Sequence, residues 1–153
     1  MKNRLTLVTI ASLLVSLSAS VALAEKPLLL YYPTITDAKG IPRMEYHVGE
    51  KVCVWITVYA SPVRYIPPLI RAPFKILIVV ETRGIAYVFG VVSGTITTGQ
   101  TKTYSFNFTV PKGVPPGFHV VKLMAWNGLI SDVLAEWKSL ATPVSASFLV
   151  VGG

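Results

Sequence analysis

From residue 28 onward, the chain is a series of short runs rich in Val, Ile, Tyr, Phe and Thr that are interrupted by Gly and Pro. Runs of this length, separated by turn residues, are typical of a β-sandwich or a β-barrel. The pattern predicts strands over residues 28–36, 43–48, 51–60, 74–82, 85–92, 101–110, 118–126 and 145–151. We therefore expect an all-β sandwich of about seven or eight strands.

One segment before the last strand departs from strand periodicity. Its apolar residues recur at helical spacing: Val133, Leu134, Trp137 and Leu140. Ser131 is a suitable N-cap, and Pro143 lies beyond the end of the pattern. The segment from Ser131 to Leu140 is therefore predicted to be one short helix, whose apolar stripe either covers an end of the core or contacts a partner.

The first two dozen residues follow a different pattern. Lys2 and Arg4 precede an apolar run dotted with Ser and Thr, which ends in Ala22-Leu23-Ala24. This arrangement is typical of a secretory signal peptide. We expect residues 1–24 to be cleaved and residues 25–153 to form one secreted or cell-surface domain. The alternative is a retained anchor, but the apolar core is too short and polar for a stable span, and no later stretch is long enough to cross a membrane.

The residue composition excludes several function classes. The net charge is +7, but the basic residues are scattered, which is not the pattern of a nucleic-acid-binding protein. Cys53 is the only cysteine, so neither an intrachain disulfide nor a multi-cysteine metal site can form. His47 and His119 have no acid or cysteine at ligand spacing, and they are expected in a turn and on a strand surface. Asp37 and Glu50 are expected to be turn residues, with a cation site between them as the alternative.

The sequence also contains no phosphate-binding loop and no nucleophile elbow. We therefore expect no catalytic residues, no cofactor and no metal, and the protein is predicted not to be an enzyme.

Several turn and core segments carry a further similarity. They are Pro33–Gly40, Val48–Val52, Ser93–Ile96, Phe108–Pro111, Pro116–His119 and Pro143–Ser145. These segments resemble the immunoglobulin-like domains of the CARDB kind, which are common in archaeal secreted and cell-surface proteins. The resemblance covers nearly all of residues 27–151 and implies an immunoglobulin-like Greek-key sandwich. Since it rests on turn and core residues, it implies nothing about activity.

Two segments are more apolar than an isolated sandwich requires. The first strand begins with residues that are apolar on both faces: Leu28, Leu29, Leu30, Tyr31 and Tyr32. It either joins its own sheet or adds to the sheet of a neighbouring subunit, which would propagate into a filament. In the strand over residues 51–60, the face opposite the core carries Cys53, Trp55 and Tyr59. Aromatic residues there predict cover by the loop over residues 62–73 or by another subunit.

Two further sites are candidates for binding or modification. The proline-rich loop contains a candidate binding set for glycans or envelope proteins: Arg64, Tyr65, Ile66, Pro67, Pro68 and Arg71. Asn107-Phe108-Thr109 is an N-glycosylation sequon on the outward face of a predicted strand.

These features predict a non-enzymatic, secreted or cell-surface structural or interaction protein, in its sharpest form a filament subunit joined by N-terminal strand addition. The alternative is a monomeric extracellular binding module for glycans or envelope proteins. The expected partners are other protein subunits, of the same or another kind, or a glycan. We expect no partnership with nucleic acid and no membrane span in the mature chain.

Overall fold

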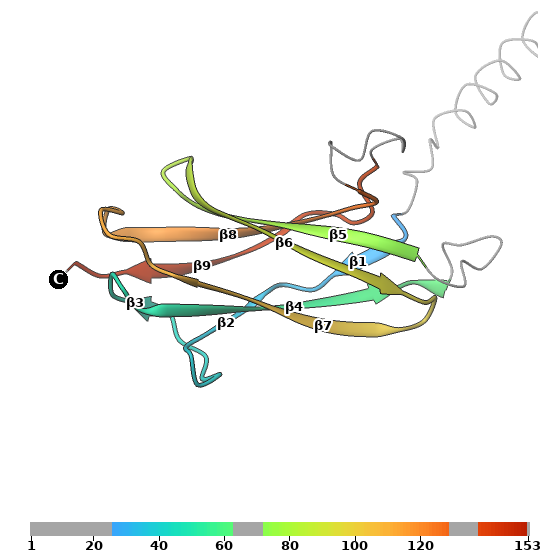
Figure 1. Ribbon diagram of the computed structural model, residues 1–153, viewed down its shortest axis with the longest axis horizontal. Coiled ribbons are helices and arrows are strands. Elements are labelled where there is room, and N and C mark those ends of the chain that lie inside the picture. The colour runs from blue at the N-terminus through green and yellow to red at the C-terminus, as the bar shows by residue number, and fades with distance from the viewer. Residues whose placement is uncertain (1–25, 63–71, 129–137, 153) are drawn as a thin grey trace, which may run out of the picture.

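Two β-sheets face each other in the computed structural model, which describes residues 26–62, 72–128 and 138–152 (Figure 1). The strands are β1 (Leu28–Leu30), β2 (Thr34–Thr36), β3 (Glu45–Tyr46), β4 (Lys51–Ala60), β5 (Ala72–Thr82), β6 (Ile85–Ile96), β7 (Thr101–Thr109), β8 (Gly117–Trp126) and β9 (Val144–Val150). The described residues contain no α-helix. The prediction of an all-β sandwich is confirmed.

The first three described strands are divided between the two sheets: β1 and β2 belong to the four-stranded sheet and β3 to the five-stranded sheet. In the four-stranded sheet, β4 lies between β7 on one side and both β1 and β2 on the other. The five-stranded sheet has the order β3-β9-β8-β5-β6, and β3 runs parallel to β9. Since β4–β5, β6–β7 and β7–β8 are connections between sheets, the topology is an immunoglobulin-like Greek key.

The core forms because the inward side chains of alternate strand residues are apolar. On β4 these residues are Val52, Val54, Ile56 and Val58, all fully buried. They face the inward residues of the other sheet, which include Phe74, Ile76, Ile78, Val121, Leu123 and Phe148. The alternation in the sequence is therefore the direct cause of the two-layer packing.

Most predicted strands have different bounds in the structure, and the run over residues 43–48 is reduced to β3 (Glu45–Tyr46). The run over residues 28–36 is broken at Tyr31–Pro33, because Pro33 has no N–H to donate to a ladder. The strand that was predicted to end at Val92 continues to Ile96. Ser93-Gly94 looks like a turn in the sequence, but Gly94 is a strand residue whose missing side chain leaves room for the Tyr104 ring.

The predicted helix from Ser131 to Leu140 lies mostly outside the described residues. Its described end is not helical: Ser139 forms a β-bridge with Trp126, and Leu140 N–H donates to Ala125 O at 2.8 Å. Leu140 O in turn accepts a hydrogen bond from Leu28 N–H at 2.9 Å. Residues 138–140 thus link the C-terminal end of β8 to β1 through hydrogen bonds.

The predicted signal peptide, residues 1–24, also lies outside the described residues. In the part of the chain that is described, no helix is long and apolar enough to span a membrane.

Candidate functional site

The predicted donor strand lies in its own sheet. Leu28 pairs with Ala60, and Leu30 pairs with Val58. Leu28 and Leu30 are only 2% and 4% exposed, so they belong to the core. The structure of the single chain therefore has the intramolecular arrangement, the first of the two alternatives that the sequence left open.

The remaining apolar residues of this segment face outward. Leu29 is exposed beside Tyr59, its partner in the register of β1 and β4. Tyr31 and Tyr32 are exposed at the break between β1 and β2, although Tyr31 N–H still donates to Thr57 O at 3.0 Å. The N-terminal strand thus combines buried anchors with an exposed aromatic connection.

The aromatic face of β4 is flanked by β2, its neighbour in the same sheet. Trp55 remains exposed, and its Nε1–H donates to Thr36 Oγ1 at 3.0 Å. Cys53, which pairs with Thr36, is a buried free thiol. Tyr59 is half-buried. The predicted covering loop and the binding set Arg64, Tyr65, Ile66, Pro67, Pro68 and Arg71 lie outside the described residues.

The sequon residue Asn107 lies on the outer face of β7, an edge strand of the four-stranded sheet. Its side chain is exposed, and so is that of Thr109 on the same face. The other outward residues of β7 are also polar: Thr101, Thr103 and Ser105. The sequon is accessible, and its glycosylation stays a prediction.

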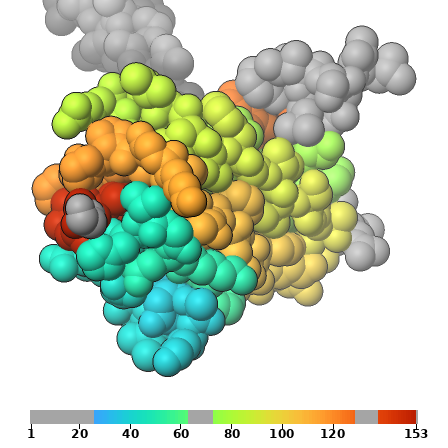
Figure 2. Space-filling view, turned by 60° about the vertical axis from the view of Figure 1, so that its left-hand side comes forward, coloured from blue at the N-terminus to red at the C-terminus, as the bar shows by residue number. Residues whose placement is uncertain are grey.

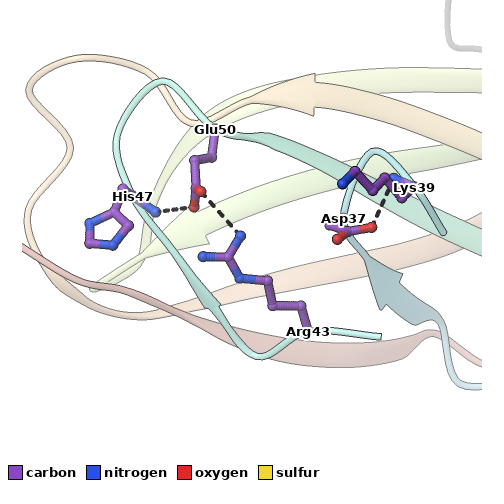
Figure 3. A network of polar contacts seen from close by, with 5 residues as sticks. All are labelled: Asp37, Lys39, Arg43, His47 and Glu50. Carbon is purple, nitrogen blue, oxygen red and sulfur yellow. Dashed lines mark hydrogen bonds and ion pairs between the residues drawn. The ribbon is translucent and has the colours of Figure 1, made fainter. Parts of the chain in front are cut away.

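The carboxylates of Asp37 and Glu50 stabilise turns (Figure 3). Asp37 Oδ1 accepts hydrogen bonds from Lys39 N–H at 2.8 Å and Ile41 N–H at 3.0 Å. The backbone hydrogen bond from Ile41 is the main cause that holds the pKa of Asp37 below its usual value, and the bond from Lys39 lowers it further. This is the arrangement of an Asx turn, in which the side chain replaces a backbone acceptor.

Glu50 closes a second turn. Its Oε2 accepts a hydrogen bond from His47 N–H at 2.7 Å, and its Oε1 pairs with Arg43 Nη1 at 3.1 Å (Figure 3). The backbone bond from His47, followed by the bond from Arg43, holds the pKa of Glu50 below its usual value. Among the described residues, no three His, Cys, Asp or Glu side chains form a group that could hold a metal ion.

The prediction that His119 lies on a strand surface is wrong. Its ring is fully buried among core residues. The carbonyl of Pro115 can only accept, so it receives a hydrogen bond from His119 Nε2–H at 2.9 Å. The other ring nitrogen, Nδ1, accepts from the Tyr87 hydroxyl at 2.7 Å. Burial raises the pKa of Tyr87 to about 12. The ring is held between two hydrogen bonds in the core and has a structural role. The signal was in the sequence, since His119 has the same strand parity as Val121 and Leu123.

Two grooves open between the elements. One, of about 340 Å³, lies between β2 and β9 and is lined by Pro33, Thr34, Ile35, Pro42, Arg43, Met44, Ala146 and Ser147. The other, of about 300 Å³, is lined by Thr82, Arg83, Ile85, Tyr87, Gly113, Val114 and Pro115. Neither lining contains an acid, a histidine or a cysteine.

The sequence reasoning missed the outer face of the five-stranded sheet. Phe89 and Val91 on β6 are 67% and 44% exposed. Val91 lies beside Leu77, which in turn lies beside Met124, so the exposed residues continue into an apolar row. The segment Val88-Phe89-Gly90-Val91-Val92 has apolar residues on both faces of the strand. This pattern could have predicted the apolar row from the sequence.

No protein-family model matches the sequence, and no curated protein matches it either. Solved structures match in fold. The C-terminal domain of Wzt has a TM-score of 0.61 and 10% identity, with 84% of this chain and 76% of that chain covered. Part of the Pseudomonas fluorescens alkylpurine DNA glycosylase AlkC has a TM-score of 0.54 and 12% identity, with 83% of this chain but 31% of that chain covered.

A CARDB domain from Pyrococcus furiosus, solved in complex with di-metal ions, has a TM-score of 0.47 and 14% identity, with 83% and 90% of the two chains covered. That score is too low to support the CARDB resemblance. At these identities, the matches above 0.5 show a shared β-sandwich fold alone.

Proposed function

We propose that the protein is a non-enzymatic, secreted or cell-surface structural protein whose copies join by exchange of the N-terminal strand. The observation that carries this proposal is the position of β1. Among the described residues it is the first strand, it lies at a sheet edge, and its only strand partner is β4. It also places two leucines, Leu28 and Leu30, in the core.

Exchange costs little free energy because every copy has the same acceptor site. A strand that leaves its own β4 and pairs with β4 of a neighbour makes the same hydrogen bonds and buries the same side chains. The contact is head-to-tail, so repetition gives an open chain instead of a closed dimer. The exposed Tyr31 and Tyr32 lie where the segment would bend to reach the next copy.

Export would prepare the strand for exchange. Cleavage after residue 24 would leave Leu28 as the fourth residue of the mature chain, with only three residues before it to thread past the neighbour. The resemblance to CARDB-like domains of archaeal surface proteins agrees with this location. The structural roles of His119, Asp37 and Glu50 agree with a function without catalysis.

A disulfide test separates the two arrangements of β1. Leu29 and Tyr59 are register partners on the outer face, and the Cα spacing of such pairs, roughly 5.5 Å, suits a disulfide. We would introduce Leu29→Cys and Tyr59→Cys into a Cys53→Ala background, allow secretion and assembly, and then oxidise. Exchange predicts a ladder of covalent oligomers on a non-reducing gel.

The matched control is Thr57→Cys with Thr103→Cys, since these register partners lie on β4 and β7, two strands that do not exchange. This variant is expected to form only intrachain bonds. If Leu29→Cys with Tyr59→Cys also gives only the monomer band, and the secreted wild type is monomeric at high concentration, the proposed assembly is wrong.

A further inference from the structure

The long edge of the five-stranded sheet has an unprotected centre. β6 is the last strand of that sheet, and its 12 residues include no charged residue and no proline. Edge strands are normally protected by charges, prolines or bulges, because their free N–H and C=O groups otherwise pair with other chains. Such protection is confined to the two ends of β6.

At the start of β6, Tyr87 is skipped in the register with β5, which marks a bulge. Near its end, Lys102 Nζ donates to Thr95 O at 2.7 Å. Between these points, residues 88–93 have no strand partner among the described residues other than β5. Their outward-directed N–H and C=O groups are available to another strand.

The side chains of this centre are apolar on the solvent side. Phe89 and Val91 are exposed, and their partners on β5 are Val79 and Leu77. The charges near this strip on the same face are Lys75, opposite Ser93, and Lys122 and Glu81, which pair with each other at 2.6 Å. The exposed residues of this edge therefore belong to a continuous apolar strip. Single exposed apolar residues scattered over a surface would need no explanation, but a continuous strip does.

The other long edge, β7, provides an internal comparison. β6 and β7 adjoin at one side of the molecule, in yellow-green and gold (Figure 2). The outward residues of β7 are all Thr, Ser or Asn, and Lys102 lies within the strand. A sandwich that only had to remain monomeric would be expected to treat its two long edges alike.

We infer that β6 pairs antiparallel with β6 of a second copy of this chain, across a twofold axis at Gly90. This register places Phe89 opposite Val91 of the second copy, and Val88 opposite Val92. Aromatic and β-branched residues are favourable cross-strand pairs. The two five-stranded sheets become one continuous sheet, and the apolar strips of both copies meet.

The second copy is the partner because the strand is self-complementary. Only an extended chain can satisfy the free backbone groups of an edge. An uncharged strand can pair with itself without like-charge repulsion, even though the whole chain carries a net charge of +7. The interface involves a different sheet from the one that holds β1, so it does not depend on strand exchange.

Sedimentation equilibrium of the full mature chain tests the inference. The wild type is expected to self-associate through β6, and Val91→Lys is expected to raise the dissociation constant of that contact by more than about tenfold, since it brings a charge into an apolar pair. The control is Thr103→Lys, an exposed position on the β7 edge, which should leave the constant unchanged. Circular dichroism checks that both variants are folded.

The register has its own test. In a Cys53→Ala background, Phe89→Cys protein is mixed with Val91→Cys protein and oxidised. With the two proteins mixed in equal amounts, the antiparallel register about Gly90 predicts that the mixed disulfide exceeds the sum of the two homodimers, which random coupling would only equal, as read by mass spectrometry. A second-copy pairing with another register would give a different preference and would contradict the inference as stated.

The two assemblies fail separately. If the wild type is monomeric at millimolar concentration, or if Val91→Lys and Thr103→Lys dimerise equally, the β6 interface is wrong whatever the strand-exchange gel shows. If another protein binds this edge while the chain stays monomeric, the second copy is the wrong partner. A Val91→Lys protein that loses the dimer but keeps the covalent ladder of the β1 test would support both proposals.

Discussion

The phenyl ring of Phe106 lies directly over Gly90, so close that a Cβ atom at Gly90 would be 2.3 Å from Phe106 Cε2. Gly90 is on β6 and Phe106 on β7, the neighbouring edges of the two sheets. Tyr104 and Gly94 repeat the arrangement, with 2.4 Å between the built Cβ and the Tyr104 hydroxyl. The missing side chains on β6 let two rings from β7 close this side of the core.

Gly90→Ala should therefore destabilise the protein. The added methyl group has to displace a packed ring, and overpacking of this kind costs about 1–3 kcal/mol. Urea denaturation of the wild type and the variant measures the difference in the free energy of unfolding. Phe106→Leu is the compensating partner: the double variant should recover part of the loss. An unchanged unfolding midpoint for Gly90→Ala would mean that the ring has room to move.

Tyr87→Phe should also be destabilising, through the buried histidine. It removes the hydroxyl that donates to His119 Nδ1 at 2.7 Å and leaves that nitrogen buried without a partner. An unsatisfied buried group of this kind costs about 1–3 kcal/mol. Thermal and urea unfolding would measure the loss. Equal stability of the two proteins would mean that the hydrogen bond between Tyr87 and His119 does not contribute to the free energy of unfolding.

Tyr46→Phe removes a buried hydroxyl as Tyr87→Phe does, but it should have the opposite effect on stability. The hydroxyl of Tyr46 is buried and has no hydrogen-bond partner in the described part of the chain. Removing it relieves the cost of burying an unsatisfied polar group while the ring keeps its edge contact with Phe148. We expect equal or greater stability in the same unfolding measurements. A loss of stability would show that a water molecule or another group satisfies this hydroxyl.

Stability should fall in strongly alkaline solution. Burial raises the pKa of Tyr46 and of Tyr87 from 10.0 to about 12. The fold thus favours the neutral phenol, so this contribution is complete below pH 10 and is lost as the pH rises from 10 to 12. Urea midpoints across this range should decrease, with a shallower decrease for Tyr46→Phe. A flat profile would contradict the assigned burial of both phenols.

Asn107 should accept a glycan when the chain is secreted by a host with N-linked glycosylation. Asn107 and Thr109 are both exposed on the outer face of an edge strand. Intact-mass analysis should find added sugar mass on the wild type, and both Asn107→Gln and Thr109→Ala should remove it. Ser105→Ala, on the same face but outside the sequon, is the control. Secreted wild type without added mass would argue against the site.

The functional candidates were predictable to different degrees. The apolar character of residues 28–32 and the position of Trp55 and Asn107 on the face opposite the core follow from composition and strand parity. Whether residues 28–30 pair with β4 of the same chain does not, because the pairing involves residues about 30 positions apart in the sequence. The unprotected edge of β6 was missed for the same reason, since a strand is an edge only in relation to the strands beside it.

The sequence by itself determined the sandwich: the two-residue alternation fixes which side chains of a strand face the core, and the bounds of β4 followed from it directly. The tertiary structure alone decided that Gly94 lies in a strand and that β6 ends a sheet. Alternation is a local property of the backbone, whereas strand order and close packing are set by segments that meet only when the chain has folded.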